Sequence, residues 1–346
     1  MNYRKQVSMM FAVLVIVSLV SACAPPAAAP TTQVQQPAPA AQQPTAATKP
    51  LRVALVLGGV INDAGIGASA YQGMQDAKTK LGIDFGYSEN VTLTDAESTF
   101  RDYASQGYDL IIANAGLFAD PVLKVAKDFP NTRFAVTNAG VSAENVAGID
   151  TKNEESGYMA GIVAGTLTKT KKVGFVLAED IMVSQRAKTG YELGVKQVCP
   201  DCQVLNSFTG SWSDIAKGKE TATALIDQGA DVLFQYADAS GLGAIQAAKE
   251  RNIMMIGSGL DQSSLAPDNV VTTTLQYFAP MIYNIIADVQ SGNFKANTVA
   301  LNGYDTGAYD LAPLNDKLVT PEQKASILGY LAKMKAGEIT LPHLTK

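Results

Sequence analysis

Short, almost entirely apolar runs recur along the chain from residue 51 onward. They are rich in β-branched residues and cover 52–57, 110–113, 133–137, 172–177, 231–235 and 253–257. A strand without polar alternation is buried on both of its faces, which is typical of parallel sheets. We therefore predict parallel β-strands at these positions.

Segments with helical periodicity separate the runs. They cover 68–81, 94–106, 120–128, 154–168, 184–198, 213–228, 241–251 and 280–291, and Thr320-Pro321-Glu322 has the pattern of a helix start near the end of the chain. Repeated alternation of strand and helix indicates an α/β fold with parallel sheets. Because the alternation runs twice, from 51 to about 150 and from about 170 to 275, we predict two doubly wound domains that share a cleft.

Ligands of open α/β sheets bind beyond the carboxyl ends of the strands, so the residues found there are candidate site residues. In the first half of the chain these are Asn114, Gly116, Phe118 and Asn138. In the second half, Asp238 follows the run 231–235, either as a helix cap or as a side chain in the cleft.

Trp212 is the only tryptophan, and it lies in Gly210-Ser211-Trp212-Ser213-Asp214, between a predicted strand and a predicted helix. A core position is one interpretation. The small polar neighbours favour a loop at the sheet edge, where the indole would offer a flat face to a planar ligand.

The segment 65–70 has the G-x-G-x-x-A pattern of a dinucleotide loop, but it begins too far after the preceding strand for that function. We expect its backbone N–H groups to remain free to meet a ligand at a helix start.

Composition excludes several functions. The chain has 27 Lys+Arg, 32 Asp+Glu and a single histidine, His343. A Ser-His-Asp hydrolase and a histidine-rich zinc site need imidazoles, and the only one lies close to the C-terminus, so we expect no catalytic residues, no metal and no cofactor. The lack of a basic cluster argues against nucleic acid as a partner.

The N-terminus has the features of an export signal. Arg4 and Lys5 precede a largely apolar stretch, and Val20-Ser21-Ala22-Cys23 resembles the bacterial lipobox, which implies cleavage after residue 22 and a lipidated Cys23. The Ala/Pro/Gln/Thr-rich residues up to 50 have the composition of an extended tether. We therefore expect a protein anchored in the cell membrane through lipid and facing the extracytoplasmic side.

Cys199 and Cys202 form a Cys-Pro-Asp-Cys unit without a second cysteine pair. A zinc site or a cytosolic redox motif is therefore disfavoured. An exported chain favours a small structural disulfide, and a reduced pair remains the alternative.

Several blocks in order resemble the basic membrane protein family, the substrate-binding lipoproteins of ABC importers. They include Glu154-Glu155-Ser156-Gly157-Tyr158-Met159-Ala160-Gly161, Gly190-Tyr191-Glu192-Leu193-Gly194-Val195, Trp212-Ser213-Asp214-Ile215-Ala216-Lys217-Gly218-Lys219 and Gly257-Ser258-Gly259-Leu260-Asp261-Gln262. The resemblance implies a binding protein rather than an enzyme, an ABC permease as partner, and a type I periplasmic-binding-protein fold with hinge crossovers. The implied lobes are 51–155 with about 277–306, and 156–276 with about 307–346.

The resemblance also implies roles for single residues. Trp212 matches one of two aromatics that stack on a base, whereas the second falls on Ile66 and its asparagine neighbour on Gly67. Asn138 stands where the family often has a base-reading Asp. Gly259 and Gln276 replace the Asp and Lys that hold the sugar, and Tyr71 and Tyr277 would add apolar walls.

These features favour a receptor for a purine base or nucleoside, with the free base preferred because both sugar ligands are replaced. The alternatives are another planar heterocycle such as riboflavin, or a sensor lipoprotein that presents a bound ligand.

Overall fold

The computed structural model describes residues 49–63 and 65–345. The predicted signal peptide at 1–22, the lipidation site Cys23 and the tether as far as residue 48 lie outside these residues. Within them, no helix combines the length and the apolar character needed to cross a membrane.

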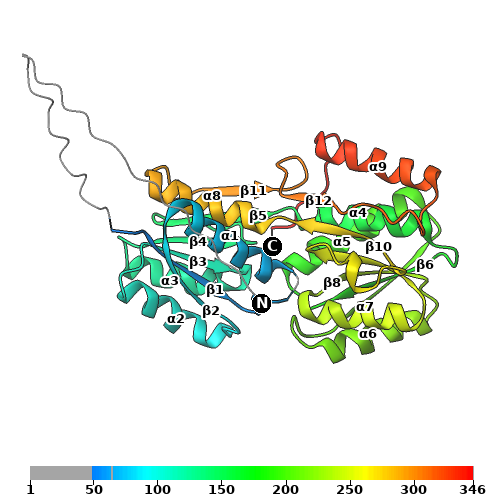
Figure 1. The fold of residues 1–346 in the computed structure, drawn as a ribbon, viewed down its shortest axis with the longest axis horizontal. Helices are drawn as coiled ribbons and strands as arrows, with labels where there is room; N and C mark the ends of the chain where they lie inside the picture. The colour runs from blue at the N-terminus through cyan, green and yellow to red at the C-terminus, as the bar shows by residue number, and fades with distance from the viewer. Residues whose placement is uncertain (1–48, 64, 346) are drawn as a thin grey trace, which may run out of the picture. The chain divides into compact units, whose positions relative to one another are not determined.

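The first lobe is built on a six-stranded parallel sheet with the order β11-β5-β4-β3-β1-β2 (Figure 1). Its strands are β1 (Arg52–Leu57), β2 (Asp84–Ser88), β3 (Leu110–Asn114), β4 (Arg133–Thr137), β5 (Val146–Thr151) and β11 (Val299–Asn302). Its helices are α1 (Ile66–Leu81), α2 (Leu93–Ser105), α3 (Ala119–Asp128) and α8 (Phe278–Ser291), with the short 3-10 helix η1 (Gly116–Phe118).

The second lobe repeats this design with the order β12-β10-β9-β8-β6-β7, in which only β12 is antiparallel to its neighbour. Its strands are β6 (Lys172–Leu177), β7 (Gln203–Phe208), β8 (Val232–Tyr236), β9 (Met254–Gly259), β10 (Val270–Gln276) and β12 (Tyr309–Leu311). Its helices are α4 (Asn153–Leu167), α5 (Met182–Val198), α6 (Ile215–Asp227), α7 (Asp238–Glu250) and α9 (Pro321–Lys335), with η2 (Ser263–Leu265).

The chain passes between the two sheets at three places: from β5 to α4, from β10 to α8, and from β11 to β12. The two sheets are thus doubly wound and joined by crossovers, and the predicted fold class is confirmed. The helix predicted after Thr320 is also present as α9, where Thr320 and Gln323 form a capping box with Pro321 in the first turn.

The predicted strands form because their side chains fill the cores on both faces of each sheet. Val53, Leu55 and Leu57 of β1 pack on the side of α1 and α8, whereas Ala54 and Val56 pack on the side of α2 and α3. This alternation between two apolar cores is the reason that the run shows no polar period.

In two of the sequence blocks that resemble the family, glycines allow two helices to pack closely. A Cβ on Gly157 of α4 would lie 1.9 Å from the carbonyl oxygen of Ala187, and one on Gly190 of α5 would lie 1.8 Å from that of Glu154. Only glycine permits the two helix backbones to approach so closely. These blocks therefore specify the core of the second lobe rather than ligand chemistry.

Candidate ligand-binding site

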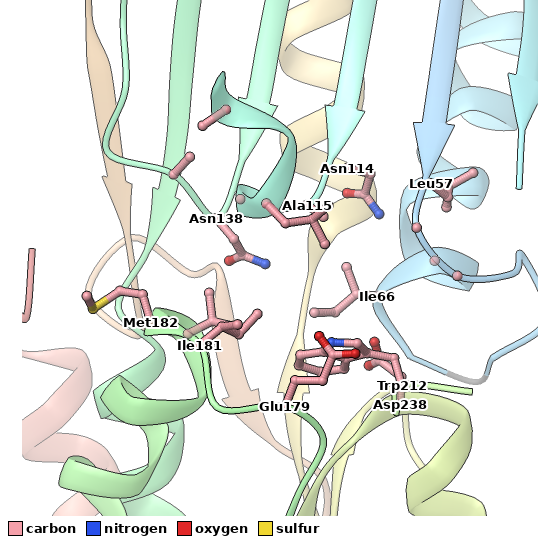
Figure 2. A pocket seen from close by; sticks show the side chains of 18 of the residues that line it. Leu57, Ile66, Asn114, Ala115, Asn138, Glu179, Ile181, Met182, Trp212 and Asp238 are labelled. Carbon is pink, nitrogen blue, oxygen red and sulfur yellow. The ribbon is translucent and has the colours of Figure 1, made fainter. Parts of the chain in front are cut away.

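A cavity of about 770 Å³ lies between the lobes, where the carboxyl ends of strands from both sheets meet (Figure 2). The first lobe contributes the residues that follow β1, β3 and β4, and the second lobe contributes those that follow β6, β7 and β8. Pockets of about 300–1,000 Å³ are usual for small molecules. Of the predicted site residues, the lining includes Ile66, Gly67, Asn114, Gly116, Asn138, Trp212 and Asp238.

Trp212, in the loop before α6, and Ile66, at the start of α1, both line this cavity, so each lobe contributes one of them (Figure 2). Trp212 precedes α6, whose N-terminus is capped by Asp214, and its carbonyl oxygen accepts a 3.1 Å hydrogen bond from Ser240 N–H. The indole is half-buried and packs partly against the apolar core of its lobe. One face of the residue is thus supported by the protein while the residue lines the cavity, a suitable arrangement for stacking.

Two amide side chains belong to the first-lobe side of the cavity (Figure 2). Oδ1 of Asn114 accepts a 3.0 Å hydrogen bond from Thr137 Oγ1. Oδ1 of Asn138 accepts a hydrogen bond from Thr151 Oγ1. Because these bonds engage the carbonyl oxygens, the two NH2 groups are the donors that remain for a ligand.

The loop before α1 is organised by Asp63. Its carboxylate accepts hydrogen bonds from the N–H groups of Gly65 at 2.8 Å, Gly67 at 2.9 Å and Ala68 at 2.9 Å. The prediction that these N–H groups are free for a ligand is therefore wrong, since a carboxylate of the same loop occupies them. Burial raises the pKa of Asp63, and the three donors oppose that rise.

Asp238 is the first residue of α7, which is preceded by Ala237 and has no side-chain cap. The helix-cap interpretation thus does not hold, and Asp238 lines the cavity. Burial, and secondarily the charge of Asp63, raise the pKa of Asp238 well above its usual value. Glu179 is a further acid in the lining. Within residues 49–63 and 65–345, no lysine, arginine or histidine forms a salt bridge with Asp63, Glu179 or Asp238.

A second acidic group lies where β5 leads into α4, and here every acid has a partner. Arg186 Nη1 of α5 lies 2.7 Å from Asp150 Oδ1, with both side chains less than 5% exposed. His343 lies between two acids, with Nδ1 2.7 Å from Glu154 Oε1 and Nε2 3.3 Å from Asp150 Oδ2. Arg186 Nε also donates to the carbonyl oxygen of Leu344 at 2.6 Å. We name Asp150, Glu154, Arg186 and His343 the hinge cluster.

The hinge cluster was not found by sequence reasoning, because its members are far apart in the chain. It attaches the C-terminal segment to both lobes and brings Thr345 into the lining of the cavity, beside Asp150 and Arg186. The one available signal was that the sole histidine lies close to the C-terminus.

Three aromatic candidates lie outside the cavity lining. Phe118 is fully buried and its ring meets that of Phe100 edge-on, at a centroid distance of 5.7 Å. Tyr71 packs edge-on against Tyr87, at 5.1 Å. Tyr277 is half-buried at the start of α8. Each of these residues lies in, or at the start of, the helix that follows a strand, and that helix directs its ring away from the cavity lining.

Gly259 and Gln276, at the ends of β9 and β10, also lie outside the lining. Gln276 is 1% exposed, and its Nε2 donates to Ser258 Oγ at 3.3 Å. Its side chain is thus engaged with the neighbouring strand of its own lobe.

A disulfide joins Cys199 and Cys202, whose Cα atoms are 5.3 Å apart, at the end of α5. Among the described residues, these two cysteines and Asp201 are the only cluster with the spacing of metal ligands. Because the sulfurs are bonded to each other, they are not available as thiolates for a metal.

Comparison with known proteins agrees with this geometry. A profile of the PnrA-like ABC transporter substrate-binding proteins matches residues 51–345. The ABC transporter nucleoside-binding protein BmpA of Lactococcus lactis subsp. cremoris is 28% identical over 304 residues, which cover 82% of this chain and 86% of that protein. A purine-binding protein of Brucella abortus is 27% identical over 296 residues, which cover 85% of this chain and 83% of that protein.

Among solved structures, an ABC transporter solute-binding protein of Aeropyrum pernix K1 superimposes with a TM-score of 0.80. The match covers 86% of this chain and 94% of that protein at 23% identity, and it shows the shared fold. The predicted resemblance is confirmed by the family profile. The chain belongs to the PnrA-like substrate-binding proteins of ABC transporters, and it is a binding protein rather than an enzyme.

Proposed function

We propose that this protein captures a free purine base between its two lobes and delivers it to the permease of an ABC importer. The observation that carries the proposal is that Trp212 of the second lobe and Ile66 of the first lobe line one cavity, with Asn114 and Asn138 on the first-lobe side (Figure 2). A planar base between Trp212 and Ile66 would receive its dispersion contacts from both faces, and the amides would donate to acceptors on its edge.

The names of two relatives support a ligand of this class. One is a nucleoside-binding protein and the other is a purine-binding protein, each matched over more than four-fifths of this chain. Their identities of 28% and 27% leave room for a change of ligand within that class.

The charges of the lining support a free base over a nucleotide. Asp63, Glu179 and Asp238 are acids, and the arginine of the lining, Arg186, is paired with Asp150. These acids would therefore repel a phosphate, and the lining residues that the structure describes offer it no unpaired lysine or arginine. Gly259 and Gln276 lie outside the lining, so neither holds a ribose there.

The lobes, 51–155 with about 277–306 and 156–276 with about 307–346, would close around the base by bending at the three crossovers. A ligand that contacts both lobes stabilises the closed arrangement over the open one, and this differential affinity drives the closure. Lipidation at Cys23 would hold the receptor at the extracytoplasmic face of the membrane, within reach of the permease.

Isothermal titration calorimetry tests the ligand. We expect adenine, hypoxanthine or guanine to bind without turnover and at least as tightly as the corresponding nucleoside. A nucleoside that binds a hundredfold tighter than its base would overturn the free-base proposal, and riboflavin binding in place of purines would overturn the purine assignment.

Metabolic labelling with a fatty acid tests the anchor. The Cys23→Ser variant should accumulate as an unlabelled precursor, whereas Cys199→Ser with Cys202→Ser should leave labelling unchanged. Persistent label in Cys23→Ser would contradict the lipoprotein assignment.

A further inference from the structure

Asp238 has an unusual backbone conformation. Its φ of 44° lies in the left-handed region, which glycine adopts freely and other residues seldom do. A strained residue of this kind persists when its surroundings hold it, and such residues cluster at ligand sites. Here the strained position carries a carboxyl group that lines the cavity next to Trp212 (Figure 2).

The carboxyl of Asp238 meets the loop of the opposite lobe. A Cβ on Gly65 would lie only 2.9 Å from Asp238 Oδ1, so this carboxyl approaches the loop closely. The backbone N–H of Ile66 is near enough to the same carboxyl to lower its pKa. Asp238 is thus fixed beside Ile66, at the place where we expect the edge of a stacked base.

Asp63 and Asp238 differ in what stabilises a negative charge. Asp63 accepts three backbone N–H bonds, whereas one backbone N–H reaches Asp238. The other charged groups of the lining are Glu179 and the ion pair of Asp150 with Arg186. Asp63 is therefore the group that stays ionised, and burial next to it favours the protonated form of Asp238.

A protonated carboxyl group has one O–H donor and an adjacent carbonyl acceptor, whereas a carboxylate has acceptors only. We propose that Asp238 binds one edge of the base through this donor and acceptor together, and so selects a purine in which an exocyclic amino or carbonyl group adjoins a ring nitrogen. Adenine and hypoxanthine have such an edge, and unsubstituted purine lacks the exocyclic group. This inference rests on the proposed function and names the specificity of its site.

The test compares Asp238→Asn and Asp238→Gly in the full-length protein, with Asp120→Asn as the control, because Asp120 is an exposed acid of α3 outside the cavity lining. Asparagine keeps a donor and an acceptor in nearly the same shape and tolerates a positive φ, whereas glycine keeps the backbone and removes both groups. Calorimetry with adenine, hypoxanthine and unsubstituted purine measures the affinities, and thermal melting verifies folding.

We expect Asp238→Asn and the control Asp120→Asn to bind adenine within about threefold of the unmodified protein, and Asp238→Gly to bind it at least about tenfold more weakly. The preference for adenine over unsubstituted purine should disappear in Asp238→Gly. As the pH rises, the affinity of the unmodified protein should fall when Asp238 loses its proton, and that of Asp238→Asn should stay constant.

Three results overturn the inference. In the first, Asp238→Asn loses as much affinity as Asp238→Gly. In the second, Asp238→Gly binds adenine as tightly as the unmodified protein, and the proposed function survives. In the third, the unmodified protein binds no purine, and the proposed function falls as well.

Discussion

Two groups of acids at and beside the cavity differ in how they are neutralised. In the hinge cluster, Asp150 and Glu154 are met by Arg186 and His343 at 2.7–3.3 Å. Near Trp212, Asp63 accepts three backbone N–H bonds, and Asp238 has neither a basic partner nor a comparable set of donors. Buried charges with good partners hold a structure together, whereas a buried polar group with spare hydrogen-bonding capacity is available to a ligand. We infer that one end of the cavity maintains the lobes and the other recognises the base.

The largest effect should come from Arg186→Ala, because it leaves the buried carboxylate of Asp150 without its cation. We expect a loss of about 3–5 kcal/mol in the free energy of unfolding, measured by urea denaturation. Arg101→Ala is the matched control, since Arg101 forms exposed ion pairs with Glu97 and Asp128 and should matter little. Equal effects of the two variants would remove the distinction between a paired structural end and a ligand end.

His343→Ala should also act on stability more than on affinity. It removes the contacts of the C-terminal segment with Glu154 and Asp150, and hydrogen bonds to charged groups contribute about 1.5–3 kcal/mol. His343→Gln can keep one of these bonds, so its free energy of unfolding should lie between that of His343→Ala and that of the unmodified protein. A His343→Ala protein of unchanged stability but greatly weakened base binding would place the hinge cluster in the ligand site.

Trp212→Ala should instead act on affinity more than on stability. Loss of base stacking costs about 1–3 kcal/mol, so we expect binding to weaken by roughly tenfold to a hundredfold. Trp212→Phe keeps an aromatic face and should retain most of the affinity by calorimetry. If alanine and phenylalanine at this position bind equally well, stacking is not what holds the ligand.

The smallest effect should come from Asn138→Ala, which removes one neutral donor and so costs about 0.5–1.5 kcal/mol of binding free energy. Asn90→Ala is the matched control, because Asn90 has the same φ of 53° and lies outside the cavity lining. Asn138→Ala should lose more stability than Asn90→Ala, because it also removes the hydrogen bond from Thr151 Oγ1, and only Asn138→Ala should lose affinity for the base. Equal affinities in both would exclude Asn138 from the site.

The strands that could be predicted are those with continuous apolar runs, such as β1 and β6, which are covered on both faces. The runs did not indicate β2 and β11, because these edge strands are partly exposed and carry polar residues. They also did not indicate β10, whose Thr272, Thr273 and Thr274 are buried but polar. Buried threonines satisfy their hydroxyls with nearby groups, and such pairing is not visible in a hydrophobic pattern.

Site residues could be predicted where they lie at the ends of strands that could themselves be predicted. Asn114 is the last residue of β3 and Asn138 directly follows β4, and sheet topology alone places both at the cavity. Phe118 also follows a strand, but η1 turns its ring into the core, and this depends on the packing of Phe100. The hinge cluster depends on pairs such as Asp150 with His343, which are separated by 193 residues. No local pattern reports contacts of that kind.

Fluorescence of Trp212 tests the central claim most directly, because it is the only tryptophan of the chain and lines the cavity. If the cavity binds a purine base against the indole, adenine, hypoxanthine or guanine should shift or quench the emission saturably, while sugars and amino acids should leave it unchanged. Emission that does not respond to purine bases, in a protein that binds them by calorimetry, would place the ligand away from Trp212 and contradict the account.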